Sequence, residues 1–465
     1  MARTCIICGG PTGSREHIFP AALGGRRTNK GIYCAGHNND YSDLAGIISG
    51  QLALFNAQLG VVGDHADHAD EVTPVTLTDV ASGREVELTN SRIRFKDPQI
   101  ISQETVGNTV TAEMSFSSKK EAEDWVREQK AKGFDVQLIG KVQKTRYHVG
   151  TAHVNMALGG NEEGLRAIGY IAQTFLAHSF SDVARLPELG AIKEYTLKNV
   201  GSGFVWWDFE PPDDLPPNKF AFGHRVIVGL NKDRGTAYAR ISLFSALNFA
   251  VLFGTVPVEA SQSVITDIDP LAKSPPDDIF CWTEAAAKGP VVKPQNLSGS
   301  LAEAISSGKA KTCIIDLMRR ITDFERQTAA KEILRKIVGA AALSEADRDT
   351  LFTNIVSSEA QRVYRLMRYI AEEFKKEATN PAAQYLSSLL DKAVALDPGC
   401  TNGLSEEATR SLAIACEALK KQISKDFKAG TLDQDRMEML IGGGPGAHAV
   451  ANAIFEPIIM TFPEK

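Results

Sequence analysis

Four side chains of metal-binding type stand in two pairs near the start of the chain. Two residues separate Cys5 from Cys8, and after 25 further residues Cys34 and His37 repeat that spacing. Each pair fits one tight knuckle of backbone, and two knuckles brought together would form a closed Cys3His site typical of structural zinc. Because all four positions of a tetrahedral ion would be filled, this zinc would stabilise the fold without catalysing a reaction. It would supply much of the folding energy of so small a segment.

A second group of reactive side chains lies between and just after these pairs. The stretch EHIFP contains Glu16 and His17, and Asn38 directly follows the last zinc ligand. An imidazole accepts a proton near neutral pH, so His17 is a candidate general base that would deprotonate a water molecule. The carboxylate of Glu16 and the amide of Asn38 offer hard oxygen ligands that suit Mg²⁺ or Mn²⁺.

The combined pattern CxxC, EHIxP and CxxH-N resembles that of the HNH endonucleases, in their zinc-stabilised form. The resemblance covers about the first 60 residues. It implies a small ββα-metal module with a treble-clef-like zinc site and a hydrolase activity on DNA. Adjacent residues of a strand point to opposite faces, so the family fold would need a bend to bring Glu16 and His17 to one ion. The implied roles are general base for His17, orientation of His17 or of the loop for Asn29, and ligands of the catalytic Mg²⁺ or Mn²⁺ for Glu16 and Asn38, with Asn39 as the alternative to Asn38.

Charge is distributed unevenly along the chain. The whole protein has a net charge of −6, whereas its first 60 residues hold five basic and three acidic side chains. An acidic protein of this kind is not coated with phosphate-binding charge, yet it can carry one basic surface. The resemblance implies DNA as the partner, and Arg15, Arg26, Arg27 and Lys30 are placed to contact its phosphate backbone.

Three regions of different character follow one another and indicate an α+β protein. Residues 1–60 form the predicted HNH nuclease domain. Residues 61–295 show mixed helix and strand patterns and form a mixed α/β domain of unknown role. From residue 296 to 465, apolar residues recur with helical periodicity between Gly and Pro breaks, which predicts an all-helical domain. The long region 61–465 would regulate or target the nuclease through a ligand or a protein partner, as in bacterial antiphage defence systems.

Local patterns predict several elements of the middle region. The stretches VTPVTLTDV and REVELTNSRIRF alternate like strands around the turn at Ser82-Gly83, and TVTAEMSF, KKEAEDWVREQKAKG and FDVQLIG predict a strand, a helix and a strand. An apolar-rich helix is expected from Gly164. The stretches RVIVGL and TAYARISLFSALNFAVLFG predict paired strands around NKDRG, where Gly235 suits a hairpin turn.

Composition excludes some classes of protein. No apolar run of roughly 18 residues or more occurs, so no membrane span is expected. The first residues lack the apolar core of a signal peptide, which predicts a cytoplasmic protein. The seven cysteines are too dispersed for a disulfide framework, and the last four, Cys281, Cys313, Cys400 and Cys416, are expected to be small buried hydrophobic residues. A double-strand cut would favour a homodimer.

An alternative function uses the same zinc ligands. A non-catalytic zinc-knuckle protein could bind nucleic acid or protein, but it would have no need for Glu16, His17 or Asn38. Three further clusters favour structural roles. They are a solvated loop around His65 and His68, an aromatic anchor for a proline-rich loop at Trp206-Trp207, and a solvated helix face at Arg362, Arg365 and Arg368.

Overall fold

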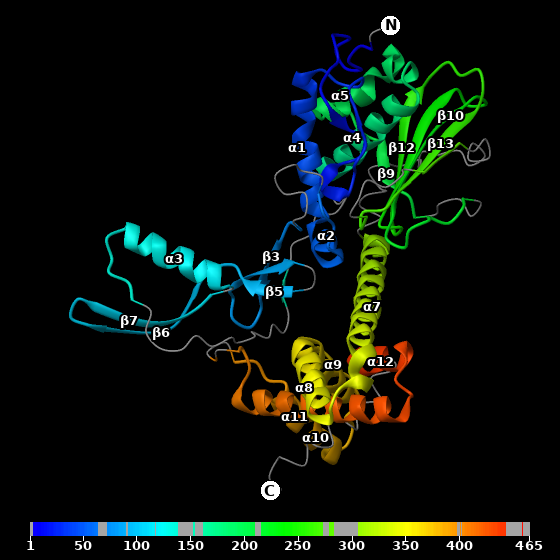
Figure 1. Ribbon diagram of the computed structural model, residues 1–465. Helices are drawn as coiled ribbons and strands as arrows, with labels where there is room; N and C mark the ends of the chain where they lie inside the picture. Colours follow the sequence, from blue (N-terminus) through cyan, green and yellow to red (C-terminus); the bar gives the residue numbers. More distant parts are fainter. Residues whose placement is uncertain are drawn as a thin grey trace. The chain divides into compact units, whose positions relative to one another are not determined.

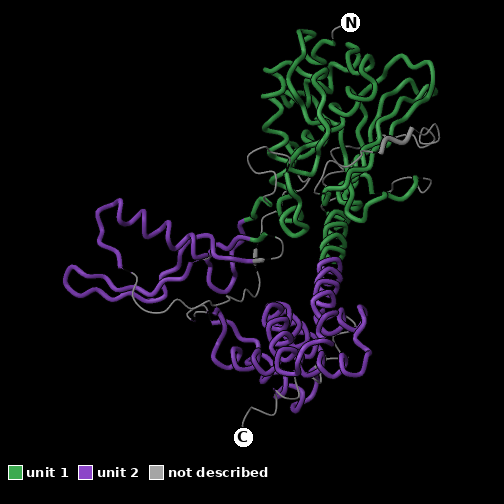
Figure 2. The backbone as a smooth tube through the Cα atoms, in the orientation of Figure 1, with its two compact units in different colours: residues 1–75, 88–91, 155–321 green, residues 76–87, 92–154, 322–465 purple. Residues whose placement is uncertain are grey.

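The computed structural model groups the chain into two compact units, and each unit contains segments that are far apart in sequence (Figure 2). Unit 1 comprises residues 1–75, 88–91 and 155–321, and unit 2 comprises residues 76–87, 92–154 and 322–465. These units divide the ranges 61–295 and 296–465 that were predicted from sequence, because residues 76–87 and 92–154 cluster with the C-terminal helices and residues up to 321 cluster with unit 1. The structure describes residues 3–63, 72–89, 92–116, 118–137, 152–153, 161–209, 215–272, 279–282, 306–397, 400, 402–442 and 458.

Unit 1 begins with a short hairpin and a helix. Strands β1 (Glu16–His17) and β2 (Thr28–Asn29) pair antiparallel, and helices α1 (Ala35–Gln51) and α2 (Ala53–Leu59) follow. Between the strands, the 3-10 turn Ala21–Leu23 ends at Gly24, whose φ of 84° is in the left-handed region that glycine adopts readily. A Cβ on Gly25 would lie 2.0 Å from the carbonyl oxygen of Phe19, so only glycine fits this reversal.

A six-stranded antiparallel sheet forms the other side of unit 1 (Figure 1). Its strands run in the order β14-β13-β10-β11-β12-β9. The predicted hairpin around Gly235 is confirmed between β10 and β11. The bounds are β9 (Val205–Trp207), β10 (His224–Asn231), β11 (Thr236–Leu243), β12 (Leu247–Thr255), β13 (Gln262–Ile268) and β14 (Ile279–Trp282).

The stretch TAYARISLFSALNFAVLFG makes two strands rather than the single strand that was predicted. Strands β11 and β12 pair through a reversal at Phe244 and Ser245, which have φ values of 53° and 52°. Non-glycine residues rarely adopt this left-handed conformation, and here the surroundings hold it. The backbone N–H of Phe244 donates to Nδ1 of His224 at 3.2 Å, and the guanidinium of Arg320 donates to the Ser245 carbonyl at 3.1 Å.

Helix α4 (Glu162–Ser179) is the middle layer of unit 1, between α1 and the sheet (Figure 1). The predicted helix after Gly164 is thereby confirmed. Asn161 caps its first turn by accepting a hydrogen bond from the backbone N–H of Gly164 at 2.9 Å. Because neighbours cover both of its sides, every residue of the helix from Gly164 to Ala177 except Arg166 is buried. The short helices that follow it are the 3-10 turns Val183–Arg185 and Pro187–Leu189 and α5 (Gly190–Lys198).

Unit 2 contains the remaining strands and most of the C-terminal helices. Its four-stranded sheet has the order β5-β4-β3-β8, and β6 and β7 form a separate hairpin. The strands around Ser82-Gly83, the strand TVTAEMSF and the helix that follows it are confirmed, whereas Phe134–Gln137 form no strand and residues 138–140 lie outside the described residues. The bounds are β3 (Val75–Asp79), β4 (Glu85–Thr89), β5 (Arg92–Phe95), β6 (Gln99–Val106), β7 (Thr109–Ser115), α3 (Lys119–Ala131) and β8 (Ala152–His153).

The C-terminal region is helical, as its periodicity predicts. Side chains of Ser344, Asn380, Ser405 and Asp433 cap four of its helices, and a core that includes Phe352, Tyr364 and Leu412 joins them. The described part of this region is therefore helical as predicted, and with the sheets of the preceding segments it makes the structure a mixed α and β fold. The helices are α7 (Lys309–Ile337), the 3-10 turn Val338–Ala342, α8 (Glu345–Ser358), α9 (Ala360–Glu377), α10 (Pro381–Ala393), α11 (Glu406–Ala429) and α12 (Gln434–Ile441).

Candidate metal centre and the hairpin beside it

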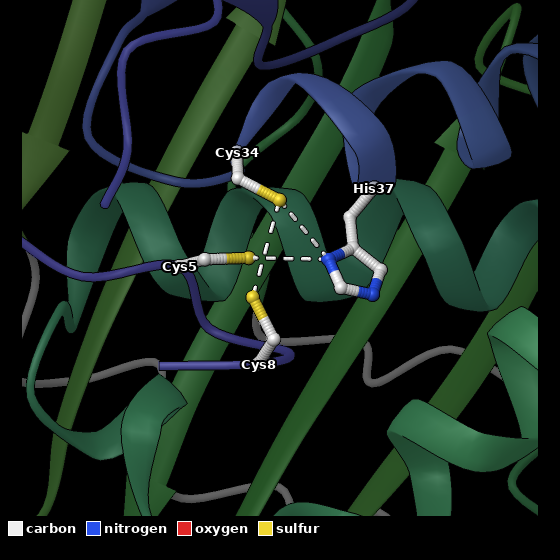
Figure 3. Close-up of side chains that lie close together, drawn as sticks. All are labelled: Cys5, Cys8, Cys34 and His37. Atoms are coloured by element: carbon white, nitrogen blue, oxygen red, sulfur yellow. Dashed lines mark hydrogen bonds between the residues drawn. The ribbon is translucent and has the colours of Figure 1, made fainter. Parts of the chain in front are cut away.

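The two predicted knuckles bring Cys5, Cys8, Cys34 and His37 together (Figure 3). Their ligand atoms all lie within 4.8 Å of one another. The Sγ atoms of Cys8 and Cys34 are 3.9 Å apart, and Nδ1 of His37 is 3.2 Å from Sγ of Cys34 and 3.7 Å from Sγ of Cys5. A tetrahedral zinc ion with Zn–S bonds of about 2.3 Å separates its sulfur ligands by about 3.8 Å. The arrangement therefore fits a Cys3His metal site that could bind zinc.

Local backbone contacts shape both knuckles. In the first, the N–H of Cys5 donates to the carbonyl of Gly10 at 2.7 Å, and Gly9 turns the chain with a φ of 69°. In the second, Cys34 is the N-cap of α1, so His37 lies in the first helical turn. The N–H of Ile6 donates to the carbonyl of Ile32 at 3.1 Å and holds one knuckle against the other.

Electrostatics favour the thiolate, the form of cysteine that binds metals, at two of the three cysteines of this centre. The backbone N–H of His37 lowers the pKa of the Cys34 thiol below its ordinary value. Burial alone would raise the pKa of Cys5, but the backbone N–H groups of Cys8, Cys34 and Ile7 lower it overall. The backbone N–H of Gly10 acts in the same direction at Cys8, but burial and the neighbouring Cys5 and Cys34 raise the pKa of the Cys8 thiol overall.

The β1–β2 hairpin beside this centre has two different faces. Glu16 lies directly opposite Asn29, and His17 lies opposite Thr28. Successive residues of a strand point to opposite sides, so Glu16 and Asn29 share one face and His17 and Thr28 share the other. Glu16 is buried, with 6% of its surface exposed, whereas His17 is half-buried. The two adjacent residues therefore have different surroundings.

Glu16 is engaged by a tyrosine of helix α4. The hydroxyl of Tyr170 donates a hydrogen bond to Oε1 of Glu16. Burial raises the pKa of Glu16 to about 7, although the Tyr170 hydrogen bond acts in the opposite direction. The carboxyl group is therefore partly protonated at neutral pH when no cation is beside it.

Asn29 contacts both its own hairpin and His178 of helix α4. Its Oδ1 accepts a hydrogen bond from the backbone N–H of Gly31 at 2.7 Å, and its Nδ2 lies 3.0 Å from Nδ1 of His178. Since an amide nitrogen can only donate, Nδ1 of His178 accepts and the imidazole carries its proton on Nε2. Burial and the nearby charges of Arg27 and Arg3 lower the pKa of His178 to about 4, which keeps this ring neutral.

Asn38 and Asn39 occupy different environments at the start of α1. Oδ1 of Asn38 is buried and makes no hydrogen bond to any residue that the structure describes. Asn39 is exposed, and its backbone carbonyl accepts a hydrogen bond from the hydroxyl of Ser42 at 2.6 Å. A buried amide oxygen without a partner is the kind of group that a cation or a water satisfies. Between the two asparagines, Asn38 therefore fits a metal ligand better.

The four basic residues predicted to contact DNA lie near the hairpin but have different surroundings. Nε of Arg15 donates to the hydroxyl of Thr28 at 3.0 Å, and Lys30, directly after β2, is exposed. Arg27 is half-buried near His178. Arg26 donates to the carbonyls of Val62 at 3.0 Å and Ala272 at 3.4 Å, so its guanidinium has a structural role.

Two residues of this site, Tyr170 and His178, were not predicted from the sequence. They lie 154 and 149 residues from their partners Glu16 and Asn29. A tyrosine and a histidine two turns apart on a buried helix are common, so no local signal distinguishes them.

The weaker sequence candidates have structural surroundings where the structure describes them. Trp206 and Trp207 are buried, which agrees with an anchoring role. Arg362 pairs with Glu359 at 2.9 Å. Cys313, Cys400 and Cys416 are half-buried rather than fully buried. His65 and His68 lie outside the described residues, as does the side chain of Cys281.

Comparison with models of known protein families, with characterised proteins and with solved structures found no match to this chain. Within the described part of the chain, no helix is both long enough and apolar enough to cross a membrane.

Proposed function

We propose that the protein is a metal-dependent endonuclease of the HNH type that hydrolyses phosphodiester bonds of DNA. The observation that carries this proposal is the Cys3His centre in the same segment as a half-buried His17 on β1 and, on α1, an Oδ1 of Asn38 that makes no hydrogen bond within the described residues. A histidine base and a hard oxygen ligand for a cation are two of the groups that phosphodiester hydrolysis uses.

His17 is the proposed general base. It would accept a proton from a water molecule while the water oxygen forms a bond to phosphorus, and the bond from phosphorus to the leaving oxygen would break. Glu16 and Asn38 are the proposed ligands of Mg²⁺ or Mn²⁺, and the bound cation would neutralise charge on the phosphate and the leaving oxygen. Of these ligands, Asn38 fits on its unsatisfied oxygen, whereas one oxygen of Glu16 already accepts a hydrogen bond from Tyr170.

The remaining parts of the proposal concern partners. Arg15, Arg27 and Lys30 lie around the hairpin and would contact DNA phosphates. The long region after residue 60 would regulate or direct the nuclease, in antiphage defence or a similar process, and two copies of the chain would allow both strands to be cut.

Plasmid cleavage with Mg²⁺ or Mn²⁺ tests the enzymatic proposal. His17→Ala should lower the cleavage rate by about 10²- to 10⁴-fold, the usual effect of removing a general base. Thr28→Val is the matched control, because Thr28 lies opposite His17 on the same face of the hairpin, and it should retain most of the activity. Equal cleavage by His17→Ala and wild type would reject His17 as the base. A zinc-loaded wild type that binds DNA but never cuts it would reject the nuclease function.

One observation favours a second function. Glu16 is buried and accepts a hydrogen bond from Tyr170, which gives it a structural role without a metal. The protein would then be a zinc-knuckle protein that binds nucleic acid or another protein and cuts neither. The same plasmid assay separates the two functions.

A further inference from the structure

Helix α4 supplies hydrogen bonds that hold Glu16 and Asn29, on the face of the hairpin opposite His17. On the basis of the nuclease function proposed above, we propose that Tyr170 and His178 are positioning residues of that site. Tyr170 orients Glu16, His178 orients Asn29, and α4 is thereby a structural part of a site that the sequence pattern confines to residues 1–60.

The spacing on α4 supports this inference. Tyr170, Thr174 and His178 are four residues apart, so they follow one another along one face of the helix. Each of them meets the N-terminal segment, through Glu16, the hydroxyl of Tyr33 at 2.9 Å, and Nδ2 of Asn29 at 3.0 Å. Three successive turns therefore engage the same segment, which a single accidental contact would not do.

The hairpin needs such support. Its two strands have two residues each, and a two-stranded ribbon this short is not stable by itself. Glu16 and Asn29 are opposite each other across the ribbon, and both hydrogen bonds from α4 end on this pair. Because orientation within a fraction of an ångström decides catalysis, a rigid helix behind the ribbon would fix both side chains at once.

The surrounding contacts make α4 a rigid support. The ring of Tyr170 stacks on Tyr41 of α1, with centroids 5.0 Å apart and an angle of 17° between the rings. Gln173 donates to the hydroxyls of Tyr33 at 3.4 Å and Tyr41 at 3.1 Å. These groups are fully buried, so an alternative placement of Tyr170 would leave polar atoms without partners.

Tyr170→Phe tests the role of the tyrosine. The substitution removes the hydroxyl that binds Glu16 and keeps the ring that stacks on Tyr41. Tyr41→Phe is the matched control, since its hydroxyl belongs to the same buried cluster but binds Thr196 and Gln173. For both variants we would measure kcat and KM for DNA cleavage, the calorimetric affinity of the zinc-loaded protein for Mn²⁺, and the thermal midpoint of unfolding.

Tyr170→Phe should lower kcat and weaken Mn²⁺ binding by about 10- to 100-fold, the loss typical when a group that orients a metal ligand is removed. KM for DNA should stay unchanged, and Tyr41→Phe should match wild type in kcat and Mn²⁺ affinity even if its thermal midpoint falls. Equal losses in the two variants would assign Tyr170 a merely structural role and overturn the inference. Higher activity of Tyr170→Phe would also overturn it, because Tyr170 would then restrain Glu16.

His178 is tested by loss and rescue. His178→Ala removes the acceptor for Asn29 and should lower kcat, whereas His178→Asn places an amide oxygen near the position of Nδ1 and should restore most of it. Failure of the rescue in a variant that melts like wild type would overturn the role of His178. Cleavage by wild type with no effect of either helix substitution would reject this inference and leave the nuclease function standing. Absence of cleavage by wild type would reject the nuclease function itself.

Discussion

The Cys3His centre and the Glu16–Asn29 face of the hairpin lie in the same segment but are built in different ways. All four donors of the metal centre come from residues 5–37, and backbone contacts within that segment shape both knuckles. The hairpin face is held by Tyr170 and His178, which are 154 and 149 residues away. A local cluster of ligands can be read from spacing, whereas the orientation of a strand depends on what the rest of the fold packs behind it.

Loss of the metal should have the largest effect on stability. It would test the part of the comparison that concerns the locally built Cys3His centre. We expect one zinc ion per chain in the wild type, and Cys34→Ser should lose it and lower the unfolding temperature of unit 1. Structural zinc contributes about 10–16 kcal/mol of apparent binding free energy in small zinc-finger peptides, so no other single change proposed for this protein should destabilise it more. Elemental analysis and calorimetry would measure both quantities.

The control for that experiment is Cys313→Ser, which removes a half-buried thiol at the start of α7. It should keep the zinc and melt close to wild type. A wild-type protein without zinc, or a Cys34→Ser variant that keeps a full equivalent, would show that the cluster is not a metal site.

Substitution of His224 tests the contacts between residues that are distant in sequence. His224 packs the N-terminal segment against the sheet. Its ring lies 5.0 Å from that of Phe19 and 4.6 Å from that of Phe244, between centroids, and it is completely buried. Burial lowers the pKa of His224 from 6.5 to about 3. Between these values the unfolded chain binds more protons than the folded one, so stability is complete above pH 6.5 and decreases as the pH falls.

At pH 5, the contribution of His224 to the free energy of unfolding should be smaller by about 2 kcal/mol than at pH 8. His178, with a pKa of about 4, acts in the same direction, whereas Glu16, with a pKa raised to about 7, acts in the opposite direction. The pH dependence of the free energy of unfolding is therefore the sum of these contributions. The difference in that free energy between wild type and His224→Asn isolates the contribution of His224. Asparagine keeps an acceptor for the N–H of Phe244. Urea unfolding should show that difference shrinking from pH 8 to pH 5, and a constant difference would refute the assignment.

The sequence predicted those parts of the site whose signal is local. The ligands Cys5, Cys8, Cys34 and His37 follow from spacing, whereas the role of Asn38 as a metal ligand stays a prediction. The separation of Glu16 from His17 also follows from the alternation of a strand, and the structure keeps that alternation where the family pattern would require a bend.

The contacts that the sequence did not predict are those made by tertiary packing. Nothing in the residues around Tyr170 or His178 indicates that their partners are Glu16 and Asn29. The reversal at Phe244 and Ser245 was missed for a related reason. Turns are usually indicated in a sequence by Gly, Asn or Pro. Here hydrogen bonds with His224 and Arg320 hold Phe244 and Ser245 in a left-handed conformation. In each case the decisive neighbour is distant in the chain.

The smallest expected effect separates two basic residues of the same hairpin. Lys30 is exposed just after β2, whereas Arg26 donates to the carbonyls of Val62 and Ala272. If Lys30 contacts a phosphate, Lys30→Gln should weaken DNA binding for all sequences and reduce the slope of log affinity against log salt by about 0.9. Arg26→Gln should lower the unfolding temperature and leave that slope unchanged.

Salt titrations of DNA binding, without added Mg²⁺ or Mn²⁺, would measure both slopes. The two slopes compare Lys30 and Arg26 directly, because these residues are four positions apart and carry the same charge. A sequence pattern treats them alike, but Arg26 is committed to backbone oxygens 36 and 246 residues away. Equal slopes for the two variants would mean that the exposure of a basic side chain near the hairpin does not decide whether it contacts a DNA phosphate. The predicted phosphate contact of Lys30 would then be wrong.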